Sequence, residues 1–267
     1  MGESAYRSME KHRVVILGSG NVATHLAKAV DKSHDVVQIY SRNMLHADSL
    51  AKKLKKCKPT CKIEDITTDA DIYIVAISDD SIKDVITSMP QVSGIIAHTS
   101  GSVGMEVFSK GKSSGVFYPL QTFSKDTDVK ITEVPFFLEA TDTETMLKLE
   151  SLASSLSEKV YKADSCQRQA LHISAVFACN FFNHLLDIST EILKEKGYTL
   201  EILEHLIKTT VAKALEIGPH DAQTGPARRG NTATINKHLE SLDKDKQKIY
   251  SLLSQSIIDR YKNSKSP

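Results

Sequence analysis

The chain has 267 residues, with 34 Lys and Arg against 33 Asp and Glu, and so a formal net charge of +1. This length suits one large domain or two modest ones, and no window combines basic with aromatic residues, so nucleic-acid binding is not expected. The apolar stretches are far shorter than the roughly 20 residues of a membrane helix, and the opening MGESAYRSMEKH lacks a signal-peptide core. We therefore expect a soluble, cytoplasmic protein that binds no membrane.

The cysteines are too few and too scattered for a disulfide framework. They are Cys57, Cys61, Cys166 and Cys179. Cys57 and Cys61 have no second ligand pair that would complete a zinc site. We expect free thiols and no metal site, with a metal role for the cysteines as the less favoured alternative.

Short aliphatic runs alternate with amphipathic segments over residues 12–163, which is typical of strands buried on both faces by crossover helices. The expected strands are 14–17, 36–40, 71–77, 94–98, 115–120 and 135–140. The expected helices between them include 21–30, 46–56 and 79–89. This pattern predicts an α/β domain with a Rossmann-like, doubly wound parallel sheet.

The remaining chain, 164–267, is predicted to form an all-helical domain. Residues 169–196 contain no proline or glycine, which predicts one long, largely buried helix that Gly197 ends. Two further helices are expected, over 200–218 and 234–261. The long helix has more apolar surface than two short neighbours can cover, so we expect a homodimer through this domain.

A turn of small residues joins the first expected strand to the first expected helix. Gly18 permits a tight turn, Gly20 lets a pyrophosphate approach the main chain, and Ala23 lets the helix pack close to the strand. The first amides and the positive end of the helix then face the phosphates. Glycine turns also follow strands for purely steric reasons, but this position in an alternating domain favours a dinucleotide. The residues predicted to bind its phosphates are Gly18, Ser19, Gly20, Asn21 and Val22.

The second expected strand ends at IYSRNM, where an acidic residue would bind the adenosine ribose of NAD. Ser41, Arg42 and Asn43 stand there instead and offer a hydroxyl, a guanidinium and an amide to a 2′-phosphate. We therefore expect NADP(H) rather than NAD(H). The alternative is that Arg42 is simply an exposed residue before a helix whose N-cap is Asn43.

Two further loops follow expected parallel strands, at the edge where such folds bind ligands. AISDDSI covers residues 76–82, and HTSGSVG covers residues 98–104. Hydroxyl-rich turns are common, so only their place at strand ends gives these residues weight. The cofactor-binding candidates from these loops are Ile77, Ser78, Asp79 and Ser100.

Five segments together resemble an uncharacterised bacterial family that joins a Rossmann-like domain to a helical C-terminal domain of unknown function. They are VVILGSGNVATHLA, HTSGS, FYPLQTF, LHISAVFACNFFNHLL and GPARRGN, and the likeness covers residues 12 to about 255. Related proteins include the pyrroline-5-carboxylate, ketopantoate and deazaflavin-dependent NADP reductases. The resemblance implies an NADP-binding fold, usually dimeric through the helical domain, with no settled substrate.

Departures from related enzymes bear on the chemistry. The family often has His where this chain has Tyr118, and a tyrosine acting there as an acid has a much higher ordinary pKa. In β-hydroxyacid dehydrogenases a lysine lies one turn before an active-site asparagine. Placing Asn180 on that asparagine puts Val176 at the lysine position. Arg229 matches the family's arginine, and Asn231 stands where an Asp is expected.

Polar residues of the long helix are the remaining catalytic candidates. His172 and Asn183 are about three turns apart, which places them on one face with Asn180 beside them, whereas His184 is interpreted as structural. This seam either closes the crevice over the nicotinamide, with the asparagines holding a carbonyl or imine and His172 exchanging a proton, or it forms hydrogen bonds within the core or a dimer interface. The catalytic candidates are Tyr118, His172, Asn180 and Asn183.

Gln121, Arg228 and Arg229 are the candidates for substrate contact, the arginines lying in the loop TGPARRGN. A loop guanidinium can bind a carboxylate or phosphate through two hydrogen bonds, but it can also cap a helix or serve a partner subunit. Together these features favour an NADP(H)-dependent reductase of a small carbonyl, imine, 2-oxo acid or hydroxy acid.

Two other functions stay open. A regulatory protein that binds NADP(H) without turnover is favoured by Val176 and Tyr118, because a fold persists when its chemistry is lost. A prephenate-like dehydrogenase would need a histidine that residue 118 does not provide.

Overall fold

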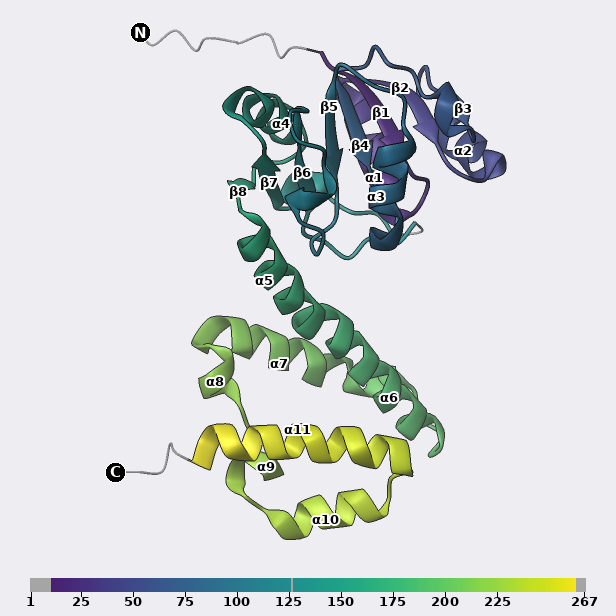
Figure 1. The fold of residues 1–267 in the computed structure, drawn as a ribbon. Helices are drawn as coiled ribbons and strands as arrows, with labels where there is room; N and C mark the ends of the chain where they lie inside the picture. Colours follow the sequence, from purple (N-terminus) through teal and green to yellow (C-terminus); the bar gives the residue numbers. More distant parts are fainter. Residues whose placement is uncertain (1–10, 126, 263–267) are drawn as a thin grey trace, which may run out of the picture. The chain divides into compact units, whose positions relative to one another are not determined.

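The structure is a computed structural model that describes residues 11–125 and 127–262. Its contacts divide the chain into a first unit that ends at Cys179 and a second unit that begins at Asn180 (Figure 1). The sequence placed the domain boundary earlier, between residues 163 and 164. The difference arises because α5 (Ser165–Ala175), the first part of the long helix, is anchored to the sheet by the buried side chain of Arg168.

The first unit is built on a sheet whose order in the described chain is β3-β2-β1-β4-β5-β6-β7-β8. The strands are β1 (Arg13–Leu17), β2 (Asp35–Tyr40), β3 (Lys58–Thr60), β4 (Ile72–Val75), β5 (Ile95–His98), β6 (Ser114–Pro119), β7 (Phe136–Ala140) and β8 (Val160–Lys162). All six expected strands are present. The strands β3 and β8 were not expected, because each has three residues and no aliphatic run.

The sheet is parallel except between β6 and β7, which pair antiparallel. A parallel pair needs a crossover, usually a helix, whereas the described residues of the loop between β6 and β7 form only the short 3₁₀ turn Ile131–Glu133. The predicted Rossmann-like α/β sheet is therefore confirmed, with a reversed direction at one edge.

The helices of this unit that pack on the sheet are α1 (Asn21–Ser33), α2 (Met44–Ala51), α3 (Asp79–Ser88) and α4 (Thr143–Leu156). Alternate residues of β1 enter different cores. Ile16 belongs to the cluster that includes residues of α1, α2 and α4, and Leu17 belongs to the cluster that includes Ile82 of α3. Both faces of the sheet are thus covered, as the aliphatic runs predict. The helix expected over 46–56 instead begins at Met44 and ends at Ala51.

In the described residues of the second unit all regular secondary structure is helical, including the 3₁₀ helix Leu200–Leu203. Its helices are α6 (Phe182–Lys194), α7 (Glu204–Ile217), α8 (Pro219–Ala222), α9 (Pro226–Arg229), α10 (Thr232–Glu240) and α11 (Lys244–Lys262). The single helix expected over 234–261 is wrong. The Asp243 Oδ1 accepts hydrogen bonds from the amides of Asp245 and Lys246, both at 3.0 Å, and this N-cap starts α11 as a separate helix.

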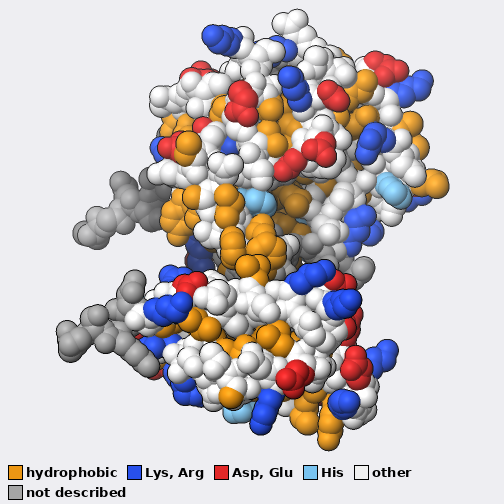
Figure 2. Space-filling model, turned by 60° about the horizontal axis from the view of Figure 1, so that its bottom comes forward, with side chains coloured by type: hydrophobic (Ala, Val, Ile, Leu, Met, Phe, Trp, Pro, Cys, Tyr) orange, Lys and Arg blue, Asp and Glu red, His pale blue; other side chains and the backbone are white. Residues whose placement is uncertain are grey.

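The long helix is continuous but irregular and more exposed than expected. A π-helical stretch, Val176–Phe181, connects α5 to α6. Within the single chain, Phe177 is 66% exposed and Phe182 is 38% exposed, so one chain alone does not bury this stretch. Figure 2 shows hydrophobic side chains among charged ones on the surface of the helical unit. No described helix is both long and apolar enough to cross a membrane.

Candidate active site

A cleft of about 580 Å³ lies at the carboxyl ends of β1, β2 and β4. It is lined by every cofactor-binding candidate from the sequence except Asp79 and Ser100. The lining residues that sequence reasoning missed are Tyr40, His46, Ala76, Ser81, Val85 and Thr99. Most are strand-end residues or belong to the first turns of α2 and α3. The placement of these elements at one edge of a parallel sheet was the signal that could have found them.

The two glycines of the first turn, Gly18 and Gly20, have different steric surroundings. Gly18 has φ +133°, and a Cβ added there would lie 2.1 Å from the Ala76 carbonyl oxygen. A Cβ added to Gly20 would meet no heavy atom within 4 Å. Gly18 therefore allows neighbouring strands to approach, whereas Gly20 leaves open space beside the main chain in the cleft.

The start of α1 provides the electrostatics that an anion needs. The first N–H groups of a helix have no acceptor within that helix, and its positive end attracts negative charge. The first turn of α1 contains no acidic residue, and the turn Gly18–Val22 lines the cleft. The residues present thus fit the diphosphate of a dinucleotide.

The β2 end of the cleft is polar and has no acidic side chain. The Ser41 hydroxyl lies 2.8 Å from the Ser19 hydroxyl, which joins the two turns. The Asn43 Oδ1 accepts a hydrogen bond from the Leu45 amide at 2.9 Å, so Asn43 is the N-cap of α2. Arg42 is exposed and lines the cleft.

Tyr118 and His172, two of the catalytic candidates, lie together in the first unit. The Tyr118 hydroxyl is 3.1 Å from His172 Nδ1, and the rings meet edge to face. Burial raises the pKa of Tyr118 to about 12, against an opposing effect of the Arg168 charge. The hydroxyl therefore keeps its proton at neutral pH. Gly101 packs against His172, since a Cβ added to Gly101 would lie 2.8 Å from the His172 ring.

The other two catalytic candidates, Asn180 and Asn183, are exposed and belong to the second unit. Their expected alignment with His172 assumed 3.6 residues per turn along the whole helix. The π-helical stretch Val176–Phe181 has wider turns, which rotate every later residue about the helix axis. The expectation of a single straight polar seam is therefore wrong.

Two of the candidates for substrate contact, Gln121 and Arg228, form contacts within their own units. The Gln121 Oε1 accepts a hydrogen bond from the amide of Thr122 at 2.8 Å. The Arg228 guanidinium lies 4.1 Å from the centre of the Tyr261 ring, a cation–π contact within the second unit, and Arg229 is exposed. The loop expected around both arginines is instead the helical turn α9, which has Pro226 at its start.

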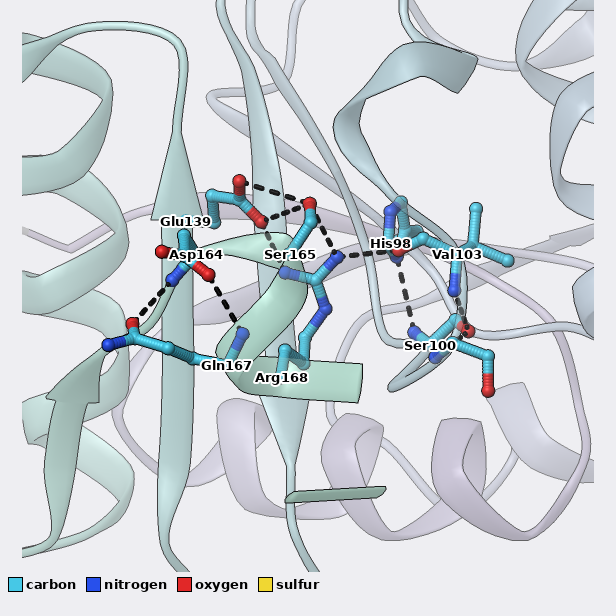
Figure 3. Close-up of polar contacts among 9 residues, drawn as sticks. His98, Ser100, Val103, Glu139, Asp164, Ser165, Gln167 and Arg168 are labelled. Carbon is cyan, nitrogen blue, oxygen red and sulfur yellow. Dashed lines mark hydrogen bonds and ion pairs between the residues drawn. The ribbon is translucent and has the colours of Figure 1, made fainter. Parts of the chain in front are cut away.

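A buried ionic cluster, the Arg168 cluster, was missed by sequence reasoning (Figure 3). Arg168 is 1% exposed, forms an ion pair with Glu139 of β7 and donates to the Val103 carbonyl at 2.6 Å. The Ser165 hydroxyl lies within hydrogen-bond distance of both Glu139 oxygens, at 2.9 and 3.1 Å. The signal available in the sequence is the capping box of Asp164 and Gln167, which fixes the start of α5 and so places Arg168 in its first turn.

His98 lies at the end of β5 beside this cluster and is fully buried. Its Nδ1 accepts a hydrogen bond from the Ser100 amide at 3.2 Å, and its Nε2 has no hydrogen-bond partner in the described chain. Burial, and then the charge of Arg168, lower the pKa of His98 to about 4. His98 is therefore neutral at physiological pH.

The described residues contain no group of three or more His, Cys, Asp or Glu side chains arranged to hold a metal ion. All four cysteines are free thiols in the structure. Burial raises the pKa of the Cys57 thiol to about 12, so this thiol is protonated at neutral pH.

Comparison with family models divides the chain into two matches. Residues 3–121 match a Rossmann-like domain. Residues 134–257 match a domain of unknown function, DUF2520. A comparison with curated proteins gives no match.

Solved structures with the same architecture extend along almost the whole chain. A protein from Bacteroides fragilis described as a "putative NADP oxidoreductase" is 39% identical over 94% of this chain and 100% of its own, with a TM-score of 0.87. A reductive aminase from Aspergillus terreus, in complex with NADPH and ethyl-5-oxohexanoate, is 14% identical over 96% of this chain and 95% of its own, with a TM-score of 0.70. A 1-pyrroline-5-carboxylate reductase from Streptococcus pyogenes is 14% identical over 95% of this chain and 99% of its own, with a TM-score of 0.64. The last two share the fold.

The neutral state of His98 predicts a loss of stability in acid. Its pKa in the folded protein, about 4, lies below the value of about 6.5 in an unfolded chain, so the unfolded state gains a proton first as the pH falls. The contribution of neutral His98 to the free energy of unfolding is fully present above pH 6.5 and is lost as the pH falls toward 4. For a pKa shift of this size the loss is at most about 3 kcal/mol. Urea unfolding at several pH values across this window measures it.

His98→Asn can keep the acceptor for the Ser100 amide while removing the titrating ring. We expect this variant to lose stability less steeply between pH 6.5 and 4 than the natural protein. The exposed His46, changed to Asn, is the control and should keep the full dependence. Parallel pH profiles for the natural protein and His98→Asn would contradict the assignment.

Proposed function

Because the chain belongs to the family that joins a Rossmann-like domain to a DUF2520 domain, we propose that it is an NADP(H)-dependent reductase of small carbonyl or imine compounds. The observation that carries this proposal is the cleft where the open side of Gly20, the start of α1 and the polar end of β2 meet. The fold shared with a reductive aminase that binds NADPH adds support.

Different residues of the cleft bind different parts of the cofactor. The first amides of α1 hold the diphosphate, and Gly20 gives it room. Arg42 and Ser41 bind the 2′-phosphate, for which a guanidinium provides a charge-assisted pair of hydrogen bonds. The bound cofactor supplies the hydride for the reduction. This assignment accounts for a polar, acid-free end of β2 in a cleft of this kind.

Tyr118 is the proposed proton donor. Once hydride has added to a carbonyl or imine carbon, the oxygen or nitrogen becomes a strong base, so even a hydroxyl with a pKa of about 12 transfers its proton readily. His172 lies at hydrogen-bond distance, where it orients the hydroxyl and can return a proton to it afterwards. Tyr118 thereby takes the role that a lysine at position 176 has in β-hydroxyacid dehydrogenases.

We also propose that the protein forms a homodimer through the helical unit. Large apolar side chains remain exposed there in the single chain, including Leu206 at 62%, Leu215 at 83% and Leu252 at 73%. A second copy of the same chain presents the same apolar surfaces, and a net charge of +1 opposes association only weakly.

Replacing Arg42 by Ala tests the choice of cofactor. We expect the Kd for NADPH to rise about 10- to 100-fold, since charge-assisted hydrogen bonds contribute about 1.5–3 kcal/mol, while the Kd for NADH changes little. Calorimetric titration with both cofactors measures this. Lys28→Ala, which removes an exposed cation of α1 outside the cleft, should leave both affinities unchanged. Equal weakening of both cofactors by Arg42→Ala would refute a 2′-phosphate site.

Tyr118→Phe tests the proton donor. With a panel of small carbonyl and imine compounds, we expect kcat for NADPH oxidation to fall by at least about 100-fold and the Kd for NADPH to stay unchanged. Tyr161→Phe, at a half-exposed tyrosine of β8, is the matched control and should keep its kcat. NADPH binding by the natural protein without turnover of any compound would favour the regulatory alternative.

Light scattering tests the dimer, which should have twice the chain mass of 29.5 kDa. Leu215→Glu places a charge on the proposed interface and is expected to shift the equilibrium toward the monomer. The control is Leu147→Glu, at a leucine of the first unit that is 59% exposed. A monomer for the natural protein at micromolar concentration would disprove the assembly.

A further inference from the structure

Arg168 has the largest fully buried side chain in the described structure, and the proposed chemistry does not use it directly. A buried cation is costly to desolvate, and apolar residues of similar size often stabilise a protein equally well. A buried arginine at this position therefore suits a role that an apolar side chain could not fill. The contacts of its guanidinium indicate that role.

The guanidinium joins three parts of the first unit (Figure 3). It pairs with Glu139 on β7, donates to the Val103 carbonyl at 2.6 Å in the loop after β5, and lies 3.3 Å from the Ser165 hydroxyl on its own helix. Its two terminal nitrogens point in fixed directions, so one can hold the carboxylate while the other holds the carbonyl. The start of α5 is thereby fixed against both the sheet and the loop.

His172 follows Arg168 by one helical turn, so the two side chains lie on the same face of α5. A contact that fixes the rotation of α5 at Arg168 consequently fixes the direction of the His172 ring. That ring meets the Tyr118 hydroxyl at 3.1 Å.

The loop after β5 also contacts the His172 ring. The Ser100 hydroxyl oxygen accepts hydrogen bonds from the amides of Ser102 and Val103, both at 3.0 Å, which makes the loop compact. Gly101, within that loop, packs so closely on His172 that an added Cβ would lie 2.8 Å from the ring. Arg168 holds this loop through the Val103 carbonyl.

We propose that Arg168 is a positioning residue: by tying Glu139 and the Val103 carbonyl to the start of α5, it holds the His172 ring between Gly101 and Tyr118. This inference rests on the proposed function for its catalytic meaning. The geometry that it predicts is measurable without any substrate.

The experiment compares the Tyr118 and His172 rings in the natural protein and in Arg168→Met by NMR, with ¹³C-labelled Tyr and His rings. Signals are assigned with Tyr118→Phe and His172→Gln. We expect a nuclear Overhauser effect between the two rings in the natural protein and its loss in Arg168→Met, with the His172 resonances shifted. Arg168→Lys keeps the cation without the fork, so it is expected to recover the effect only partly.

Two controls separate positioning from general destabilisation. Leu152→Ala creates a cavity at a fully buried residue of α4 and should keep the ring contact while it lowers stability. Gly101→Ala leaves the Arg168 cluster in place but displaces the ring, so it should weaken the contact directly. An unchanged ring contact in Arg168→Met would overturn the proposal. If Arg168→Met does not fold, full recovery of the contact in Arg168→Lys would overturn it equally.

Cofactor titration of the same variants distinguishes the two proposals. We expect the Kd for NADPH to stay within about threefold in Arg168→Lys, because the residues proposed to hold its diphosphate and 2′-phosphate lie at the turn between β1 and α1 and at the end of β2. Absence of NADPH binding in the natural protein would refute the proposed function, while the ring contact would still decide the role of Arg168. If the natural protein reduces a substrate, kcat in Arg168→Lys should fall about tenfold with KM for NADPH unchanged.

Discussion

The close approach of main chain at Gly18 is the constraint on which the cleft depends. The Gly18 amide donates to the Tyr40 carbonyl at 2.8 Å, and its Cα faces the Ala76 carbonyl with no space for a side chain. The ends of β2, β1 and β4 are brought together at this one residue. The chain can then enter α1 directly, so that the amides of its first turn open onto the strand ends. A side chain here would force the strands apart and remove the shape of the cleft as well as its positive end.

The sequence predicts the features that local patterns determine. Strands of a parallel sheet are buried on both faces, so their aliphatic runs stand out from the amphipathic helices between them. The glycine turn and the Asn43 cap are read equally well, because each is specified within a few residues. The break between α10 and α11 could also have been predicted, since Asp243 is a typical N-cap residue before a helical segment. The short strands β3 and β8 give no such pattern.

Contacts between distant segments could not be predicted in the same way. Arg168 and Glu139 are separated by 29 residues, and Tyr118 and His172 by 54. Taken alone, the sequence around each of these residues predicts only a polar side chain on a helix or strand. Only the order of strands β5, β6 and β7 and the attachment of α5 bring them together. The π-helical stretch is a further limit, because it breaks the constant rotation per residue that underlies any argument about helix faces.

The position of this stretch gives the departures from related enzymes a physical meaning. It begins at Val176, which corresponds to the lysine of β-hydroxyacid dehydrogenases if Asn180 is placed on their active-site asparagine. In the proposed mechanism Tyr118 provides the proton from the end of β6 instead, and its hydroxyl lies 3.1 Å from His172 Nδ1. A donor carried by a strand needs its helical partner held in place, since a small rotation of α5 would separate the two rings. Under the proposed positioning role, the buried Arg168 cluster meets this need, because it ties the start of α5 to β7 and to the loop after β5.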